Sequence, residues 1–233
     1  MIHPYEDRYR RVYSAGARFW TSPVPTEELA EFIRGWNIPA GSKVIEFGCG
    51  EGRDSIFLAK SGFDVTAIDN APSAIQRAKK RATEEGIELN FLVGDVTALK
   101  SIPDNSYDLG VNIACLHMFP RYEDRRRHLS EAFRVLNRKA IFYLLNMAML
   151  EKEEISKEFG ENWEYPKVGE LTPRNIVVDG KEKEILLPII AAHNTNKEEI
   201  TKEMGEVGFE LLQIERRKTK PQGICWIVVA RKP

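Results

Sequence analysis

The sequence predicts an α/β protein with a mostly parallel sheet, formed as one domain with an insertion. The main evidence is residues 43–69, where an apolar segment, a glycine-rich turn, an amphipathic segment and a second apolar segment follow one another and end in Asp69. The alternation of strand-like and helix-like segments continues to about residue 147. The chain has 233 residues, 42% of them hydrophobic and 30% charged, which is enough for one such domain.

Composition and charge narrow the possible functions. The 34 basic and 35 acidic residues give a net charge of −1, so we expect a small-molecule partner and no nucleic acid. No apolar segment approaches the roughly 18 residues that cross a membrane, and the polar, aromatic start of the chain is unlike a signal peptide. Cys49, Cys115 and Cys225 lie far apart, without metal-ligand spacing. We therefore expect a reduced, cytoplasmic protein without a metal, either a monomer or a homodimer.

Residues 1–36 are expected to contain a cover for the sheet and one helix. Residues 1–22 are rich in tyrosine and arginine, and they could form either an amphipathic cover for the end of the sheet or a lid over a bound ligand. Pro25 interrupts the chain, and Thr26 is the predicted cap of a helix that extends to about residue 36. Apolar residues recur in that helix at helical spacing, so one of its faces should pack on the core.

The central elements follow from the same periodicities. Within residues 43–69, the apolar run at 44–47 suits a buried parallel strand, the segment 54–60 is an amphipathic helix stopped by Ser61-Gly62, and 65–68 is a second strand. In the later helices, charged and apolar residues recur at helical spacing. We expect the basic cluster 125–127, in the helix at 122–136, to face solvent. In order, we predict a helix at 73–85 ended by Gly86, a third strand at 89–93, a fourth at 107–113, a helix at 122–136 and a fifth strand at 139–147.

Residues 149–193 are expected to form an insertion after the fifth strand. Residues 151–159 look helical, and the segments 176–178 and 185–187 flank Asp179-Gly180, a typical β-hairpin turn. Such an insertion would stand over a ligand pocket and shape substrate choice. Beyond it we predict a helix capped by Thr195 and ended by Gly208, then strands at 209–214 and 224–230.

The glycine turn after the first strand indicates a bound ligand. Gly48, Gly50 and Gly52 let backbone amides approach a ligand closely, because no Cβ stands in the way. A dinucleotide fingerprint would place its third glycine where Arg53 stands, so that ligand class is disfavoured. Glu46 would repel a pyrophosphate and suits a ligand with a cationic end. The alternative is a glycine turn with only a structural role.

This stretch resembles motif I and the following acidic strand of the class I S-adenosylmethionine-dependent methyltransferases, with the acid, the glycines and Asp69 at the expected spacing. Within this class, residues 48–69 look most like the small-molecule branch that includes thiopurine and tellurite-resistance methyltransferases. Arg53-Asp54 directly after the glycines supports that resemblance, although Asp54 also suits a helix N-terminus. The resemblance implies S-adenosyl-L-methionine as cofactor. It also implies a Rossmann-like three-layer sandwich with a seven-stranded, mostly parallel sheet whose last strand is antiparallel, an N-terminal helical lid (1–36) and a substrate-side insertion (149–193).

The resemblance also assigns roles along the chain. Asp69 would bind the ribose hydroxyls, Asp95 the adenine amino group, and either Asn112 or the backbone of Ile113 the ammonium of the cofactor. Asp95 could equally cap a helical turn at 96–100. The candidate cofactor-binding residues are Arg18, Trp20, Glu46, Gly48, Cys49, Gly50, Gly52, Asp69, Asn70, Asp95, Val96, Asn112 and Ile113.

His117 is the candidate catalytic residue. The implied reaction is an in-line displacement at the sulfonium methyl, in which the protein mainly aligns the partners. An oxygen or nitrogen acceptor must lose a proton, and His117 follows the fourth strand where the transferred methyl would lie. The alternative is that His117 only packs and hydrogen-bonds in its loop. His193 is a second candidate base if the insertion folds over the crevice.

Three functions remain open from the sequence. The first is methyl transfer to a small molecule with a sulfur, oxygen or nitrogen nucleophile. The second is methylation of RNA or protein, which would need a basic surface beside the pocket, such as Arg121, residues 125–127 and Lys139; the loop 112–115 also lacks the prolines of the nitrogen-base methylators. The third is a non-catalytic module that binds S-adenosylmethionine. A nucleotide-dependent dehydrogenase is a distant fourth, disfavoured by Arg53 and Glu46.

Overall fold

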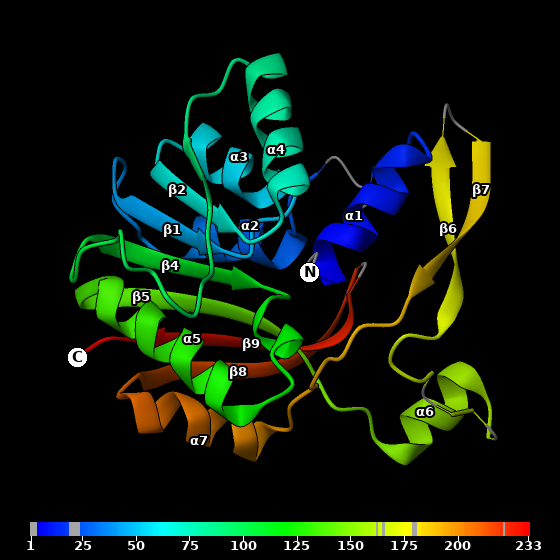
Figure 1. Ribbon diagram of the computed structural model, residues 1–233. Helices are drawn as coiled ribbons and strands as arrows, with labels where there is room; N and C mark the ends of the chain where they lie inside the picture. Colours follow the sequence, from blue (N-terminus) through cyan, green and yellow to red (C-terminus); the bar gives the residue numbers. More distant parts are fainter. Residues whose placement is uncertain (1–3, 19–23, 162, 165, 179–180, 221) are drawn as a thin grey trace.

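A seven-stranded sheet forms the centre of the computed structural model, which describes residues 4–18, 24–161, 163–164, 166–178, 181–220 and 222–233 (Figure 1). The strands are β1 (Lys43–Phe47), β2 (Asp64–Asp69), β3 (Asn90–Val93), β4 (Tyr107–Ile113), β5 (Leu136–Met147), β8 (Glu210–Thr219) and β9 (Gly223–Arg231). Their order across the sheet is β3-β2-β1-β4-β5-β9-β8. Strands β1 to β5 pair in parallel, and β9 is antiparallel to both of its neighbours. The predicted mostly parallel sheet with an antiparallel last strand is confirmed.

Helices cover both faces of this sheet and make it the middle of three layers (Figure 1). Period-two alternation in β1 sends Ile45 and Phe47 into a cluster with α5 (Tyr122–Val135) and α7 (Lys197–Val207), and sends Val44 into a cluster with α2 (Glu27–Gly35) and α3 (Arg53–Lys60). Helix α4 (Pro72–Glu84) packs beside α3 and β3 through alanines and Ile75. The sheet is therefore buried on both faces, as its apolar strand sequences require.

The remaining elements form a separate layer beside the sheet. Strands β6 (Leu171–Val178) and β7 (Lys181–Pro188) make an antiparallel hairpin, and helix α6 (Lys152–Phe159) precedes it. Helix α1 (Pro4–Ser14) lies between this hairpin and α4 (Figure 1). Tyr9 and Val12 of α1 pack with Ile176 and Leu187 of the hairpin and with Ala74 of α4. The hairpin matches the predicted one, but its strands are longer than the sequence pattern suggested.

One predicted helix cap was wrong, and the other lies at the predicted position without making a cap hydrogen bond. Asn196 caps α7: its side chain accepts from the Glu199 amide at 2.8 Å, while the Glu199 carboxylate accepts from the Asn196 amide. Thr195 is instead buried and receives a hydrogen bond from the Asn146 side chain at 3.0 Å. Thr26 stands at the N-cap of α2, but its hydroxyl donates to Asp54 at 2.9 Å and makes no cap hydrogen bond.

The order of the strands reverses between β1 and β4, which places a switch point at their carboxyl ends. In open α/β sheets, ligands bind in the crevice at this point. Strand β1 is followed by the glycine turn and β4 by the loop that contains His117, so both predicted segments meet there. None of the helices in the described part of the chain combines the length and hydropathy needed to cross a bilayer.

Candidate functional site

A cavity of about 620 Å³ opens at the carboxyl ends of the parallel strands. Its walls come from the glycine turn, the ends of β2 and β4, the loops after β3 and β4, helix α1, strand β6 and the chain that follows β7. Small-molecule sites in proteins have volumes of roughly 300 to 1,000 Å³. The cavity is therefore large enough for a small ligand, and it lies where the strand order predicts one.

The glycine turn is shaped by two close approaches. Gly48 has a φ of +75°, and a Cβ on it would lie 2.6 Å from the Cys115 sulfur, so only glycine fits between the turn and the β4 loop. The amides of Gly48 and Cys49 both donate to the Ile68 carbonyl, at 2.8 and 3.0 Å, which fastens the turn to β2. Gly48 and Cys49 line the cavity.

Gly52 allows close packing between the turn and its neighbouring elements. A Cβ on Gly52 would lie 2.9 Å from the Phe91 ring and from Ala78, so this glycine allows α4 and β3 to pack against the turn. Neither Gly52 nor Gly50 lines the cavity, although the Gly50 amide is bound to Asp69, which does.

Asp69 joins the turn to the end of β2. Its Oδ2 accepts from the Gly50 amide at 2.8 Å, and its Oδ1 accepts from the Ala71 amide at 2.9 Å. The side chain is buried and, with Asn70, lines the cavity. One carboxylate therefore holds the glycine turn in place and presents negative charge to the ligand space, as the strand–turn–helix–strand pattern predicted.

Glu46 supplies a second buried acid at the same end of the cavity. The Ser55 hydroxyl donates to its carboxylate, and the side chain is only 3% exposed. Burial, followed by the nearby Asp54, raises the pKa of Glu46 well above its ordinary value. A cationic group placed beside Glu46 would favour the ionised carboxylate, so this position suits the positive end of a ligand.

Arg53 and Asp54 form a buried ion pair next to Glu46. The Arg53 guanidinium contacts Asp54 at 2.9 Å and donates to the Thr26 hydroxyl at 2.5 Å. Asp54 also accepts from the Thr26 amide at 2.6 Å. Asp54 thus ties the start of α2 to the start of α3, a role beyond the favourable helix-dipole position suggested by the sequence.

Asp95 and Val96 line the wall that follows β3. Asp95 accepts from the amide and the hydroxyl of Thr97, both at 2.8 Å, so it organises its own turn while its side chain borders the cavity. The expected helical turn at 96–100 is a sequence of turns in the structure, not a helix. Val96 is buried, and its carbonyl accepts from His128 Nδ1 at 3.2 Å.

Asn112 does not face the cavity, which corrects the expectation that its amide would hold a ligand ammonium. Its Nδ2 donates to His128 Nε2 at 2.6 Å, and its Oδ1 accepts from the amides of Cys115 and Leu116 at 3.3 Å. Asn112 and His128 are both fully buried, and burial lowers the pKa of His128 to about 4. The Asn112 side chain therefore stabilises the loop after β4 from its buried side, and Ile113 and Ala114 line the cavity instead.

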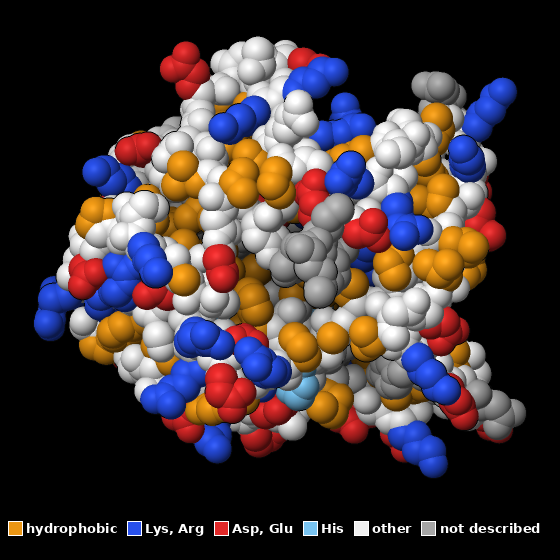
Figure 2. All heavy atoms as spheres, in the orientation of Figure 1, with side chains coloured by type: hydrophobic (Ala, Val, Ile, Leu, Met, Phe, Trp, Pro, Cys, Tyr) orange, Lys and Arg blue, Asp and Glu red, His pale blue; other side chains and the backbone are white. Residues whose placement is uncertain are grey.

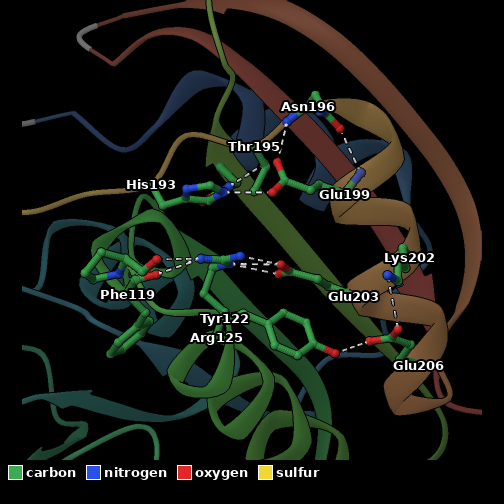
Figure 3. Close-up of polar contacts among 12 residues, drawn as sticks. Phe119, Tyr122, Arg125, His193, Thr195, Asn196, Glu199, Lys202, Glu203 and Glu206 are labelled. Carbon is green, nitrogen blue, oxygen red and sulfur yellow. Dashed lines mark hydrogen bonds and ion pairs between the residues drawn. The ribbon is translucent and has the colours of Figure 1, made fainter. Parts of the chain in front are cut away.

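His117 lines the cavity and is held neutral. Burial lowers the pKa of His117 to about 4, and its Nδ1 has no hydrogen-bond partner among the described residues. His193 is tied to the same loop through its backbone, which donates to the His117 carbonyl at 2.7 Å. The His193 imidazole points to Glu199, 2.9 Å away, and does not line the cavity (Figure 3). Between the two candidate bases, only His117 is placed to meet a ligand.

The two cysteines of the site are free thiols, Cys49 buried and Cys115 half-buried. Burial raises the pKa of Cys49 and of Cys115, and nearby Asp69 raises both further. A thiol attacks as its thiolate, so neither side chain is suited to nucleophilic chemistry at neutral pH.

The N-terminal helix reaches the cavity through residues that the sequence analysis did not select. Tyr5, Arg8 and Tyr9 of α1 line it, and their spacing of three and four residues on a helix is the signal that could have identified them. Arg18 is exposed and does not line the cavity, so it does not serve as the predicted partner of a ligand carboxylate in this structure. Trp20 lies outside the described residues.

The segment after β5 contributes Arg174, Ile189, Ile190 and Ala192 to the opposite wall. No motif or regular spacing in the sequence singles out these residues. They reach the site because the β6–β7 hairpin packs against α1, and this is a long-range contact that local patterns do not encode.

The loop that follows His117 is anchored by a buried ion pair (Figure 3). Arg125 of α5 contacts Glu203 of α7 at 2.6 Å, and it also donates to the carbonyls of Phe119 and Pro120 at 3.2 and 3.1 Å. Both charged side chains are at most 4% exposed. The expectation that the whole cluster 125–127 faces solvent is therefore wrong for Arg125, whose guanidinium supports two cavity-lining residues.

Comparison with known proteins agrees with this geometry. Residues 44–139 match the family described as "Methyltransferase domain". This central part of the chain is therefore similar to a methyltransferase domain. Solved structures of S-adenosylmethionine-dependent methyltransferases share its fold. One is a 1,6-didemethyltoxoflavin-N1-methyltransferase from Burkholderia thailandensis with bound 1,6-didemethyltoxoflavin and S-adenosylhomocysteine. It is 16% identical, has a TM-score of 0.65, and the match covers 100% of this chain and 91% of that one.

Two curated relatives are more similar in sequence over shorter stretches. An S-adenosyl-L-methionine-dependent Diels-Alderase from Talaromyces variabilis is 30% identical over 146 residues, which is 59% of this chain and 49% of the relative. A ubiquinone biosynthesis O-methyltransferase from Xanthomonas axonopodis pv. citri is 30% identical over 114 residues, 46% of each chain. The chain spans about half the length of these curated relatives.

Proposed function

We propose that this chain binds S-adenosylmethionine at the glycine turn and transfers its methyl group to a small-molecule acceptor in the same cavity. The observation that carries the proposal is the cavity itself. At one end the turn, Glu46 and Asp69 offer carboxylates for an ammonium, a sulfonium and a ribose. Helix α1 and the β6–β7 hairpin wall the rest, so one enclosure serves both the cofactor and its acceptor.

The residue roles follow from position. The carboxylate of Asp69, which the Gly50 amide holds in place, would bind the ribose, and the Glu46 carboxylate would face the ammonium. Gly48 and Cys49, whose amides are bonded to the Ile68 carbonyl, would let the methionine part approach the turn closely. Asp95 and Val96 would border the adenine. S-adenosylmethionine brings an activated methyl group, whereas the protein aligns the acceptor with it and excludes water from the cavity. The finer assignment to the branch of thiopurine and tellurite-resistance methyltransferases rests on residues 48–69, with Arg53-Asp54 directly after the glycines.

A macromolecular acceptor is less well supported. Helix α1 and the hairpin enclose the cavity, and basic and acidic side chains are interspersed on the face shown in Figure 2. Of the basic residues that a nucleic acid would need, Arg125 is buried and Arg121 and Arg127 are paired with Asp124. We therefore favour a small molecule, and we also propose a cytoplasmic monomer or homodimer, in keeping with three free cysteines.

The proposal is tested by binding and transfer measured separately. Calorimetric titration should show that S-adenosylmethionine and S-adenosylhomocysteine bind. The methyl-labelled cofactor should then pass its label to one or more members of a panel of small phenols, carboxylic acids, amines and thiols. Label found only in added RNA or protein would contradict the small-molecule assignment. Binding without transfer to any acceptor would contradict methyl transfer, and it would favour a non-catalytic module that binds S-adenosylmethionine.

His117 is proposed as the general base for an oxygen or nitrogen acceptor. Because its pKa is lowered to about 4, it is neutral and able to accept a proton throughout pH 5 to 8, and it becomes protonated only as the pH falls through about 4. We expect His117→Gln to lower kcat by roughly 10²- to 10⁴-fold. The affinity for S-adenosylmethionine should stay within about twofold, because His117 is not among the groups that hold the cofactor.

The pH profile separates catalysis from packing. In the wild-type enzyme, kcat should fall as the pH falls through about 4, where His117 becomes protonated. His117 should cause no change in kcat near pH 6.5. His193→Gln is the matched control, since His193 faces Glu199 and should leave kcat unchanged. If His117→Gln and His193→Gln turn over at the same rate and with the same pH profile, His117 only packs in its loop.

A further inference from the structure

Two arginines from different elements converge on the cavity. Arg8 comes from α1 and Arg174 from β6, and both line the space that the acceptor would occupy. Both side chains are partly buried. Arg8 Nη1 donates to the Pro188 carbonyl at 2.8 Å, which fixes the guanidinium at the end of β7 beside the hairpin that contains Arg174.

The two positive charges act on each other. Burial lowers the pKa of both arginines, and the charge of Arg174 lowers that of Arg8 further, so the guanidinium groups are near enough to repel. A guanidinium that is partly withdrawn from bulk water interacts strongly with a nearby anion. A ligand that supplies negative charge between α1 and β6 would therefore be attracted to both side chains.

The acids of the cavity have contacts on other walls. Asp69 accepts from Gly50 and Ala71, and Asp95 accepts from Thr97. Asp124 contacts Arg121 at 2.7 Å and also pairs with Arg127 on α5.

The remaining two acids are bound beside the glycine turn. Asp54 pairs with Arg53 at 2.9 Å, and Glu46 accepts from the Ser55 hydroxyl. The cavity is thus divided by charge, with carboxylates at the glycine turn, where a cationic cofactor fits, and guanidinium groups on the α1 and β6 walls.

Apolar residues complete the same part of the cavity. Ile189 and Ile190 follow β7, Met147 ends β5, and Phe119 borders the space from the His117 loop. Such walls suit an apolar body, while a planar guanidinium suits carboxylate or phosphate oxygens. We propose that the acceptor is a small molecule with an apolar body and an anionic group, a carboxylate or phosphate, which Arg8 and Arg174 bind together. This deepens the proposed function and rests on it.

The test uses small anions as probes of the whole chain, first without cofactor and then with saturating S-adenosylhomocysteine. Benzoate and phenyl phosphate are compared calorimetrically with neutral benzamide and cationic benzylamine. We expect at least one anion to bind more than tenfold more tightly than benzamide. Arg8→Gln and Arg174→Gln should each weaken that binding at least tenfold, whereas Arg10→Gln on the exposed face of α1 should not change it. Equal binding of benzamide and the anions, or no effect of either arginine variant, would overturn the proposal.

A second arm identifies the source of the anion, because S-adenosylmethionine also has a carboxylate. If the arginines serve the acceptor, both variants keep the wild-type affinity for S-adenosylhomocysteine, which also shows that they are folded. If they weaken it at least tenfold, and if decarboxylated S-adenosylmethionine binds wild type and variants alike, the carboxylate is that of the cofactor and the acceptor assignment is wrong. Failure of the wild-type chain to bind S-adenosylhomocysteine would refute the proposed function instead. The two failures can be told apart, because the anion titration without cofactor does not depend on cofactor binding.

Discussion

Replacing Asp69 by alanine is expected to reduce the affinity for S-adenosylmethionine by at least about 100-fold. A carboxylate that accepts from two ribose hydroxyls makes two charge-assisted hydrogen bonds, each worth about 1.5 to 3 kcal/mol, and roughly 1.4 kcal/mol corresponds to a tenfold change in affinity. The substitution also removes the acceptor for the Gly50 and Ala71 amides, so the glycine turn loses its link to β2. Both effects weaken the same site.

Two variants separate these effects from general destabilisation. Asp69→Asn keeps the shape and one acceptor oxygen, so we expect an intermediate loss, on the order of tenfold. Asp64→Ala is the matched control, because it replaces the same residue type at the exposed, opposite end of β2 and should leave the affinity unchanged. Calorimetric titration gives the affinities, and thermal unfolding shows whether each variant is folded. An Asp69→Ala variant that binds S-adenosylmethionine as tightly as Asp64→Ala would remove the main support for the cofactor site.

The sequence predicted those parts of the site that depend on local order along the chain. Glu46, Gly48 and Asp69 lie on adjacent parallel strands or on the turn between them. Once the strands are recognised, their carboxyl ends must meet at one edge of the sheet. The spacing of Glu46, the glycines and Asp69 therefore almost completely determines where these residues lie relative to one another. The cavity is found at the place that this spacing predicts.

Side chains whose environment depends on distant partners were harder to predict. Asn112 lies near the end of β4, where a ligand-binding residue is expected, but its side-chain amide is hydrogen-bonded to His128 in the next α-helix. Tyr5 and Arg8 share one face of α1, yet only the contact of α1 with the β6–β7 hairpin shows that this face meets the cavity. Arg174 has no local signal at all. In each case tertiary packing decides the role, and a single sequence contains no record of that packing.

Arg125 shows the same limit and carries the second large expectation. Its neighbours Arg126 and Arg127 are exposed, whereas Arg125 is buried with Glu203 between α5 and α7 (Figure 3). Removing one member of a buried ion pair leaves the other charge buried and uncompensated, which costs about 3 to 5 kcal/mol. We expect Arg125→Ala to lower the free energy of unfolding by this amount, measured by urea denaturation. The carbonyls of Phe119 and Pro120 lose their donor in the same variant.

Comparison variants make this expectation specific to the buried pair. Arg126→Ala, one residue away and exposed, should change the free energy of unfolding by no more than about 0.5 kcal/mol. The double variant Arg125→Met with Glu203→Leu leaves no buried charge, so it should recover much of the loss. Because Phe119 and Pro120 line the cavity, the double variant should still bind acceptor less well even where its stability returns, since its methionine donates no hydrogen bond to their carbonyls. If Arg125→Ala is no less stable than Arg126→Ala, the pair does not hold α5 against α7, and the loop after His117 must be fixed by its apolar contacts alone.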